Sequence, residues 1–566
     1  MKEIVNLELD LLGSCLQEIK VSIKWKPVDL YQEFNFPKWT PGSYKIRDHV
    51  QYLYSLVLEQ DGQVVPVKRV ETSKWSAQLD NLNLLKLTYI IEARNLTVRT
   101  SYIDDQLALL CMSNIVMLIN EHRYSNYHIE LNMKDEWKAY FPLEKINSYY
   151  FASDYDALVD STLAAGIFES KKITVRNYIH ELLLIGKPPK GWPNCLIDDV
   201  IRICNAACSI FNEDPPSGDR YIFMIQILDN AYGGLEHDNS TFIQYDWRRL
   251  EEKGGYRKLL QLIGHEYFHQ WNVRRLRPIE YVIYDYNKAI ISESLWFAEG
   301  ITSYFDLALP MLASISSQDE FLDDLAIDIS EVLSTPGRKY QSLSESSKEA
   351  WVKLYLSTLQ SKDSQINYYR FGTILAFCLD IRLREQDSSL SLLMRNLWDK
   401  FGRTRAGYNR IDIKNEIDML SFGISKDLDE WLDGTDSLPI DSILEKVGCS
   451  LIQSSKNVLN TGLHLKESNG YLKVMRVSSN SPASLSSLVV NDQIIAINNH
   501  QVSKLDDVYT LTKTDCYSTF TFFRNGVLMT TSLEANLDRE LKWSIQDSLN
   551  PSSAELELRN RWLTII

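Results

Sequence analysis

Apolar and polar residues alternate in short runs through the first part of the chain, and turn residues separate these runs. Alternation with a period of two is typical of strands that bury one face. We therefore predict an all-β, β-sandwich-like N-terminal domain over residues 1–168. The runs that carry this pattern are IKVSIKW (19–25), YLYSLVLEQ (52–60), LLKLTYIIEA (84–93) and YHIELNM (127–133).

The spacing of apolar residues changes at about residue 170. One strand-like run, RYIFMIQIL at 220–228, is followed by long stretches in which apolar residues recur every three or four positions, to about residue 440. This period is that of an amphipathic helix. We predict an α+β domain with a helical extension over residues 169–442, so the chain is multidomain, as its length of 566 residues also indicates.

Short strand-like runs with Gly and Asn turns return in the last part of the chain and predict a separate β domain over residues 450–535. This segment resembles a PDZ domain. Gly462-Leu463-His464-Leu465 stands where the carboxylate-binding loop of that fold would lie, and SPASLSSLVVNDQIIAINN (481–499) matches its second half. Residues 536–566 are expected to form a C-terminal tail of mixed helix.

Composition narrows the classes of function. The net charge of −15 argues against a surface for nucleic acid or anionic membranes, and it mildly favours substrates that are neutral or carry an amine. The most apolar stretch, residues 107–119, is too short and too interrupted to cross a bilayer and is expected to be a buried strand. No secretory signal is evident and no cysteine pair is spaced as CxxC, so we expect a cytoplasmic protein.

An HExxH motif, His265-Glu266-Tyr267-Phe268-His269, lies in one of the helical stretches. Residues i and i+4 share one face of a helix, so both imidazoles can bind the same metal ion while Glu266 stands beside it. The rest of this helix is apolar, which favours a buried site over a solvated face. Zinc, one ion per chain, is the expected metal.

A catalytic zinc requires a third protein ligand and one open position. We select Glu299, because a carboxylate within the apolar run LWFAEGITSYF (295–305) needs a partner to be tolerated. Glu293 lies on another helical face and is expected outside the ligand set. The remaining downstream candidates are Glu280, Asp285 and Asp306.

Together these segments resemble the gluzincin aminopeptidases related to aminopeptidase N. The spacer of 29 residues between His269 and Glu299, the segment HQWNVRRLRP (269–278), the turn PGSYKIRD (41–48) and the PDZ-like module are similar to the glycyl aminopeptidase family. The resemblance covers nearly the whole chain. It implies a thermolysin-like peptidase domain and a preference for small first residues, Gly or Ala.

Two further motifs follow from the resemblance. Gly233-Gly234-Leu235-Glu236-His237 resembles the exopeptidase motif, in which the Gly-rich strand binds the substrate backbone and the Glu holds the free α-ammonium. An anionic carboxylate there favours free over acylated amino termini. The alternative for this segment is a turn followed by a surface Glu-His pair.

The second motif, Tyr368-Tyr369-Arg370-Phe371-Gly372, resembles the segment that delivers a tyrosine hydroxyl to the oxyanion, and Tyr369 is the matching position. Phe371 departs from the family, whose members commonly carry Lys there. The choice between Tyr368 and Tyr369 therefore stays open, as does simple core packing of either ring.

The sequence as a whole predicts a zinc aminopeptidase that acts on peptides with a free amino terminus, with Glu266 as the base, Tyr369 at the oxyanion and Gly233, Gly234 and Glu236 binding substrate. One alternative is a catalytically inactive scaffold whose PDZ-like module binds a peptide or protein partner. Another is a zinc endopeptidase in which Glu236 does not recognise an amine. The oligomeric state is left open.

Overall fold

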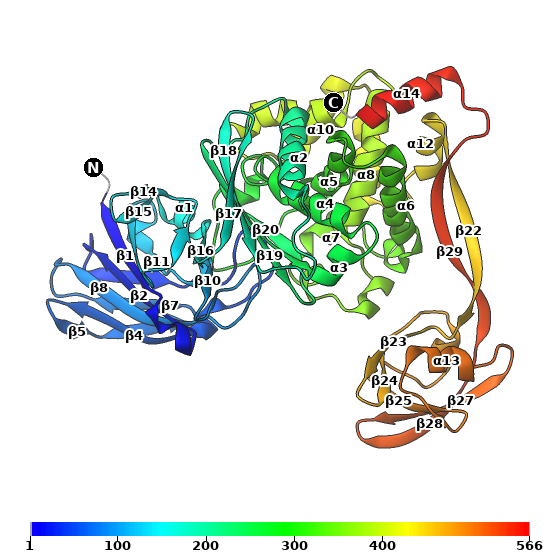
Figure 1. Ribbon diagram of the computed structural model, residues 1–566, viewed down its shortest axis with the longest axis horizontal. Helices are drawn as coiled ribbons and strands as arrows, with labels where there is room; N and C mark the ends of the chain where they lie inside the picture. The colour runs from blue at the N-terminus through cyan, green and yellow to red at the C-terminus, as the bar shows by residue number, and fades with distance from the viewer. Residues whose placement is uncertain (1–2, 565–566) are drawn as a thin grey trace. The chain divides into compact units, whose positions relative to one another are not determined.

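The computed structural model describes residues 3–564 (Figure 1). The chain divides into two compact units. The first runs to Gln318 and also includes Gln386–Ser425, while the second consists of Asp319–Glu385 and Lys426–Leu563. Each unit is a set of elements with its own buried core.

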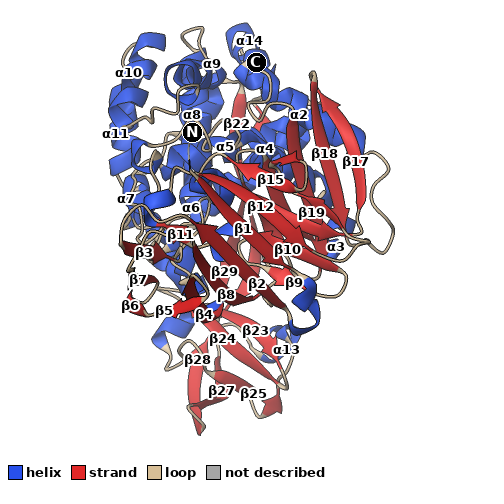
Figure 2. Cartoon of the chain, turned by 90° about the vertical axis from the view of Figure 1, so that its left-hand side faces the viewer, coloured by secondary structure: helices blue, strands red, loops and turns tan. Residues whose placement is uncertain are grey.

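The N-terminal part of the first unit is all β, as predicted. Its largest sheet has eight strands, and the alternation read from the sequence is visible in β8 (Leu85–Glu92), where every second side chain is buried. Figure 2 shows most of these strands side by side. In order across the sheet they are β14 (Glu144–Ile146), β15 (Tyr149–Ala152), β12 (Asn126–Asn132), β1 (Ile4–Asp10), β2 (Glu18–Trp25), β8 (Leu85–Glu92), β4 (Leu53–Gln60) and β5 (Gln63–Val65).

Two four-stranded sheets complete this β domain. The apolar stretch 107–119 supplies a strand to each of them, and most of its residues are buried. One sheet has the order β13 (Lys138–Tyr140), β16 (Thr162–Gly166), β10 (Leu107–Cys111) and β9 (Tyr102–Ile103). The other has the order β11 (Leu118–Ile119), β3 (Tyr31–Asn35), β7 (Lys74–Gln78) and β6 (Val67–Glu71).

A five-stranded mixed sheet and a group of helices form the α+β part of the first unit. The central strands β19 (Arg220–Leu228) and β21 (Ser240–Asp246) are almost wholly buried and pair in parallel. The edge strand β20 (Tyr232–Glu236) pairs antiparallel with β21. In order, the strands are β17 (Glu169–Val175), β18 (Tyr178–Ile185), β19 (Arg220–Leu228), β21 (Ser240–Asp246) and β20 (Tyr232–Glu236). The helices of this unit are α1 (Tyr155–Val159), α2 (Leu196–Phe211), α3 (Trp247–Glu251), α4 (Gly255–Phe268), α5 (Ile301–Leu312), α9 (Leu390–Leu397) and α10 (Arg410–Leu420).

The second unit begins with helices and continues into a long two-stranded ribbon. The ribbon strands β22 (Cys449–Asn460) and β29 (Asn536–Asp547) pair antiparallel over their whole length. The helix α11 (Ile424–Asp433) crosses the division between the units in the sequence. The other helices are α6 (Gln318–Ser334), α7 (Leu343–Lys348), α8 (Tyr368–Arg384), α12 (Ile440–Lys446), α13 (Leu505–Leu511) and α14 (Ser553–Thr564).

A small β domain lies between the two ribbon strands. Its core is a cluster of buried aliphatic side chains together with Phe520 and Phe522. The strands are β23 (Leu463–Ser468), β24 (Tyr471–Val477), β25 (Gln493–Ile497), β26 (His500–Gln501), β27 (Tyr517–Arg524) and β28 (Val527–Glu534). The segment expected as a tail differs from that expectation, because β29 completes the ribbon and α14 buries Trp562.

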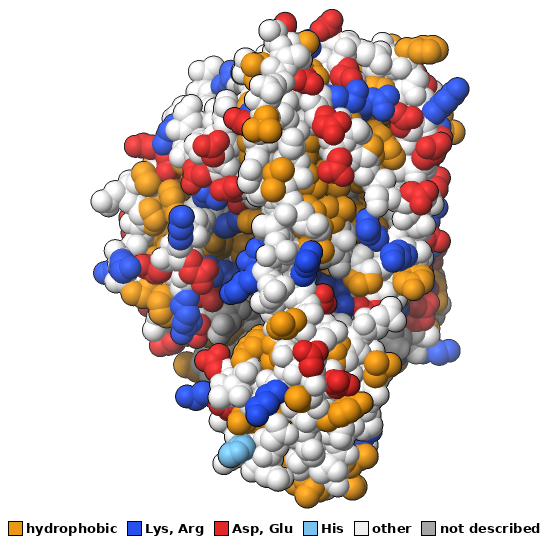
Figure 3. Space-filling model, turned by 90° about the vertical axis from the view of Figure 1, so that its right-hand side faces the viewer, with side chains coloured by type: hydrophobic (Ala, Val, Ile, Leu, Met, Phe, Trp, Pro, Cys, Tyr) orange, Lys and Arg blue, Asp and Glu red, His pale blue; other side chains and the backbone are white. Residues whose placement is uncertain are grey.

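The described residues contain no helix whose length and apolar character would suit a membrane crossing. On the face shown in Figure 3, Lys and Arg side chains are interspersed with Asp and Glu side chains. Neither sign of charge dominates this face, as is common for a protein surface in water.

Candidate active site

The HExxH motif occupies the C-terminal end of α4. His265 lies in the last turn, and His269 is the residue that caps the helix. The helix buries Leu259, Leu260 and Ile263, so apolar packing fixes the end that carries the motif. The two imidazole rings lie with their centroids 4.5 Å apart, as expected for side chains one helical turn apart.

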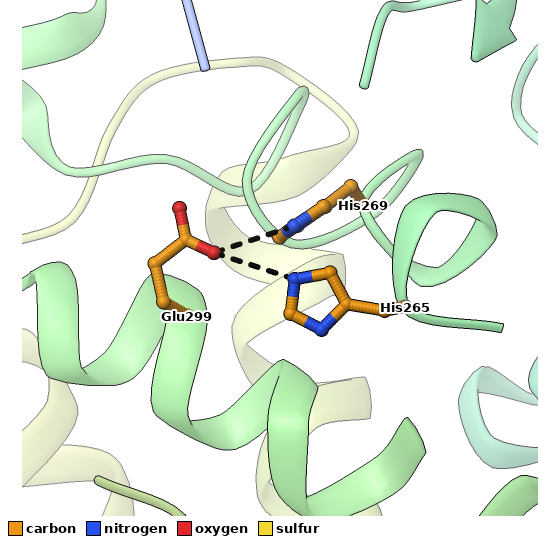
Figure 4. Close-up of side chains that lie close together, drawn as sticks. All are labelled: His265, His269 and Glu299. Carbon is orange, nitrogen blue, oxygen red and sulfur yellow. Dashed lines mark ion pairs between the residues drawn. The ribbon is translucent and has the colours of Figure 1, made fainter. Parts of the chain in front are cut away.

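Glu299 reaches the same point from a π-helical turn, η6 (Trp296–Gly300), that leads into α5. Its Oε2 lies 3.6 Å from Nε2 of His265 and 3.4 Å from Nε2 of His269 (Figure 4). Glu299 is only 2% exposed. One ligand atom from each of the three side chains lies within 4.8 Å of the others, so the structure brings the expected ligand set together.

The Nδ1 atom of each imidazole, on the side of the ring away from Glu299, has a hydrogen-bond partner. Nδ1 of His265 lies 2.8 Å from Oδ2 of Asp306, and Nδ1 of His269 lies 2.7 Å from the backbone carbonyl oxygen of Asn272. Such partners fix the ring orientation and leave each Nε2 directed at the shared point. Asp306, one of the candidates for the third ligand, therefore lies on the far side of His265 from Glu299.

Asn272 also ties the two helical segments together. Its side-chain amide donates to the carbonyl oxygens of Phe297, at 3.0 Å, and Ala298, at 3.1 Å. These carbonyls belong to η6, which carries Glu299. The end of α4 and the π-helical turn are thus held in one arrangement.

The charges at this point favour a cation. Burial alone would raise the pKa of the Glu299 carboxyl, but the imidazoles of His269 and His265 hold it well below its usual range. Burial opposes protonation of His265, yet the carboxylates of Asp306 and Glu299 raise the pKa of its imidazole well above the ordinary value. Two imidazoles and a carboxylate, all buried or nearly so, form a donor set of the kind that holds catalytic zinc.

Glu266 stands beside these three residues and is 4% exposed. Its Oε2 has no hydrogen-bond partner among the residues that the structure describes. Burial, opposed by His265 and His269, raises the pKa of its carboxyl to about 7. A Cβ on Gly234 would lie 2.3 Å from Oε1 of Glu266, so only glycine at that position leaves room for the carboxylate.

Gly233, Gly234 and Glu236 all lie on the edge strand β20. Glu236 is 4% exposed, and its Oε1 likewise lacks a hydrogen-bond partner within the described part of the chain. One ligand atom each from Glu236, Glu266 and His269 lies within 4.8 Å of the others. The structure therefore places the predicted exopeptidase motif against the HExxH motif.

The turn at residues 41–44 of the β domain also enters this site. A Cβ on Gly42 would lie 2.6 Å from both carboxylate oxygens of Glu236, and the Tyr44 hydroxyl donates to Oε1 of Glu299 at 3.0 Å. From the sequence, a rigid turn is expected here, with a role at the edge of a substrate cleft as the alternative, but the contacts with Glu236 and Glu299 are not predicted. The signal was its Pro-Gly dipeptide between aromatic residues, which predicts a rigid turn without revealing its neighbours.

Comparisons with known proteins agree with this assembly. Two family models match: the M61 glycyl aminopeptidase over residues 258–375 and the peptidase M61 N-terminal domain over residues 6–167. The first range contains the HExxH motif and Glu299. The chain carries both domains of the M61 glycyl aminopeptidase family. The resemblance read from the sequence is confirmed, and no curated protein matches the chain.

Solved structures extend the comparison. The M61 chain superposes on a crystal structure of an aminopeptidase N family protein from Idiomarina loihiensis with a TM-score of 0.91 and 26% identity, covering 99% of this chain and 100% of that one. A mutant M1 zinc metallopeptidase from Deinococcus radiodurans bound to Tyr-Ser-Ala gives 0.49 at 12% identity, covering 78% and 95%. Yeast LTA4 hydrolase with bestatin gives 0.48 at 13%, covering 79% and 70%.

Tyr369 belongs to the second unit of this M61 chain, in the first turn of α8. The Asn367 side chain caps that helix, and the Tyr369 hydroxyl lies 3.1 Å from the Tyr355 hydroxyl. Tyr368 is fully buried and its ring stacks on that of Tyr369, whereas Tyr369 is half-buried. Phe371 lines a cavity together with Trp431 and other apolar residues. The role of Tyr369 remains a prediction.

On the sequence-based prediction that Glu266 is the base, replacing Gly234 by alanine should lower kcat by about 10²–10⁴, because the new Cβ would displace the Glu266 carboxylate. The φ angle of Gly234 is not in the left-handed region, so alanine introduces no backbone strain of that kind. Steady-state kinetics and zinc content measure the effect. A double variant with Glu266→Gln should be no slower than Glu266→Gln alone; additive losses would show that Gly234 acts by another route.

Proposed function

We propose that this M61 chain is a zinc-dependent aminopeptidase that hydrolyses the first peptide bond of peptides with a free amino terminus. The proposal depends on one observation. His265, His269 and Glu299 lie close together, and the buried carboxylates of Glu266 and Glu236 lie beside His269. A donor set for zinc, a base and a carboxylate suited to an ammonium thus share one site.

His265, His269 and Glu299 would hold one zinc ion per chain, with Asp306 and Asn272 orienting the imidazoles. When bound, zinc polarises a carbonyl oxygen and lowers the pKa of a neighbouring water. Three protein ligands leave a position open for that chemistry. His269 and Glu299 are buried and His265 is nearly so, which limits the access of bulk water to the three side chains.

Glu266 is proposed as the general base. Its buried carboxylate accepts a proton from the attacking water and passes it to the leaving amine. The oxygen without a hydrogen-bond partner is consistent with a group that exchanges protons with substrate and water rather than one that holds up the fold. Gly234 permits the position by leaving the space beside Oε1 empty of side-chain atoms.

Glu236 is proposed to bind the α-ammonium of the substrate. Its carboxylate is buried and retains an oxygen without a partner in the described chain, which a charged amine would supply. The edge strand β20, with Gly233 and Gly234, offers backbone groups to an extended peptide in the manner of strand addition. Fixing the amine there lets only the first peptide bond reach Glu266.

Tyr369 is proposed to donate its phenol to the oxyanion of the tetrahedral intermediate, with Tyr368 as the alternative. Loss of such a donor typically lowers the rate by about 10²–10³. The exposure of the two rings favours Tyr369, because Tyr368 is fully buried in its own unit. A neutral phenol suits the role, since it donates without adding a charge.

The finer points of architecture and specificity are also proposals. Family membership supports a preference for Gly or Ala as the first residue and a thermolysin-like fold for the peptidase domain within residues 169–442. The domain held between β22 and β29 has a β core and one helix beside β23, consistent with a PDZ-like module that binds a peptide or protein. Residues 1–168 would be the N-terminal domain.

Glycyl and alanyl chromogenic amides, each with a free and an acetylated amino terminus, test the proposal. We expect zinc-dependent cleavage of the free forms only. Cleavage of both forms would instead indicate an endopeptidase, and no cleavage by zinc-loaded protein would indicate a scaffold.

The Glu236→Gln variant tests the amine-binding role separately. Removal of the charge weakens the hold on the ammonium, so kcat/KM for free substrates should fall by at least tenfold while zinc content is unchanged. The preference for free over acetylated substrates should shrink as well. A variant that keeps the full preference would show that another group recognises the amine.

A further inference from the structure

The two carboxylate oxygens of Glu299 have different partners. Oε2 faces the imidazoles of His265 and His269, whereas Oε1 accepts a hydrogen bond from the Tyr44 hydroxyl at 3.0 Å. Tyr44 is 3% exposed and lies 255 residues earlier in the chain, in the β domain. The phenol therefore holds the oxygen that does not face the imidazoles.

The segment that delivers Tyr44 is anchored on both sides. The backbone N–H of Lys38 donates to the carbonyl oxygen of Tyr286 at 2.9 Å, and the indole N–H of Trp39 donates to that of Asp285 at 2.9 Å. The guanidinium of Arg47 donates to the Ser43 hydroxyl at 2.7 Å. The turn is thus attached to the peptidase part of the same unit just before Tyr44 and stiffened just after it.

Gly42 makes this close approach feasible. Its φ of +82° lies in the left-handed region, and its Cα passes so close to Glu236 that a Cβ would overlap the carboxylate. The turn therefore touches both functional carboxylates, Glu236 through Gly42 and Glu299 through Tyr44. A turn placed only to pack the interface of two domains would not need a buried hydroxyl directed at Glu299.

We propose that Tyr44 is a positioning residue for the metal site: its hydroxyl holds Oε1 of Glu299, so that Oε2 alone is presented as the third ligand. The proposal rests on the proposed function, because it assumes that Glu299 binds zinc. A carboxylate can otherwise rotate about its last bond or offer both oxygens at once. A charge-assisted hydrogen bond to one oxygen removes that freedom before the ion arrives.

The Tyr44→Phe variant removes only the hydroxyl. We expect zinc affinity to fall by about 10–100-fold, the usual effect of losing such an outer partner, measured by competition with a chromophoric chelator at fixed pH. Replacement of zinc by Co²⁺ gives a second readout, because the visible absorption of the bound ion reports its ligand geometry. That spectrum should change in Tyr44→Phe.

Tyr281→Phe is the matched control. The Tyr281 ring packs against that of Tyr44, with centroids 6.0 Å apart, but its hydroxyl donates to the backbone carbonyl oxygen of Ile290 at 3.0 Å. This variant also loses one phenol and one hydrogen bond in the same region. It should retain the wild-type affinity and the wild-type Co²⁺ spectrum, and thermal unfolding of the metal-free forms checks that both variants are folded.

Three outcomes of these measurements test the role proposed for Tyr44. Loss of affinity and a changed spectrum in Tyr44→Phe alone support the proposal. Wild-type affinity in Tyr44→Phe, or equal losses in both variants, overturns it while leaving the proposed peptidase intact. If the wild-type chain itself binds no zinc tightly, the proposed function fails and the role of Tyr44 fails with it.

Discussion

Replacing Glu266 by glutamine should lower kcat by about 10²–10⁴ without loss of zinc, since this is the range that a positioned acid or base contributes. Glutamine keeps the shape of the side chain but cannot accept the proton of the attacking water. The ligand atoms of His265, His269 and Glu299 are untouched, so the metal content of the purified protein should stay at one ion per chain. Steady-state kinetics on a glycyl amide and elemental analysis measure both quantities.

Glu293→Gln is the control for this result. Glu293 lies six residues before Glu299, outside the group of side chains that meets at the two imidazoles. The same change of carboxylate to amide there should leave kcat within about threefold, as expected for a residue outside the reacting groups. Retention of most activity in Glu266→Gln would remove Glu266 as the base.

The second large effect concerns the metal itself: Glu299→Gln should weaken zinc binding by more than about 100-fold, beyond the range for an outer partner. Both imidazole nitrogens lie within 3.6 Å of the Glu299 carboxylate, which supplies the negative charge among the three donors. An amide oxygen is a weaker ligand and carries no charge. Chelator competition against wild-type protein measures the change in affinity.

Asp306→Asn provides a graded comparison. Asp306 contacts the outer nitrogen of His265 at 2.8 Å, so we expect it to orient this imidazole without binding the metal itself. Its replacement should lower zinc affinity by about 10–100-fold, less than Glu299→Gln does. The ranking of the two variants is the test. If Asp306→Asn weakens binding more than Glu299→Gln, Asp306 is the third ligand and Glu299 has another role.

Much of this arrangement could be predicted from local patterns. Period-two alternation in segments such as β8 predicts strands because it needs only neighbouring positions, and it correctly gave an all-β N-terminal domain. The spacing of His265 and His269 likewise fixes a shared helical face. Glu299 was selected because an isolated carboxylate in an apolar helix needs a partner, and the structure places it at the two imidazoles.

Contacts between segments that lie far apart in the sequence could not be predicted from local patterns. Nothing in the local pattern around Gly42 or Tyr44 shows that they meet Glu236 and Glu299, because those contacts depend on how the β domain is attached to the peptidase domain. The strand β29 was missed for a similar reason. Its partner β22 lies across the whole intervening β domain, and a long, mostly exposed ribbon has no alternating buried face to reveal it.

The register of that ribbon determines what removal of the small β domain would change in the second unit. Asn460 and Asn536, the last and first residues of the two strands, stand opposite each other. A two-residue turn in place of residues 461–535 would therefore close the ribbon as a hairpin without changing the pairing of its strands. Removal of residues 461–535 would also remove Arg476 and its ion pair with Asp363 in the second unit. The register of the ribbon therefore allows the small β domain to be exchanged for a turn without a shift of either strand.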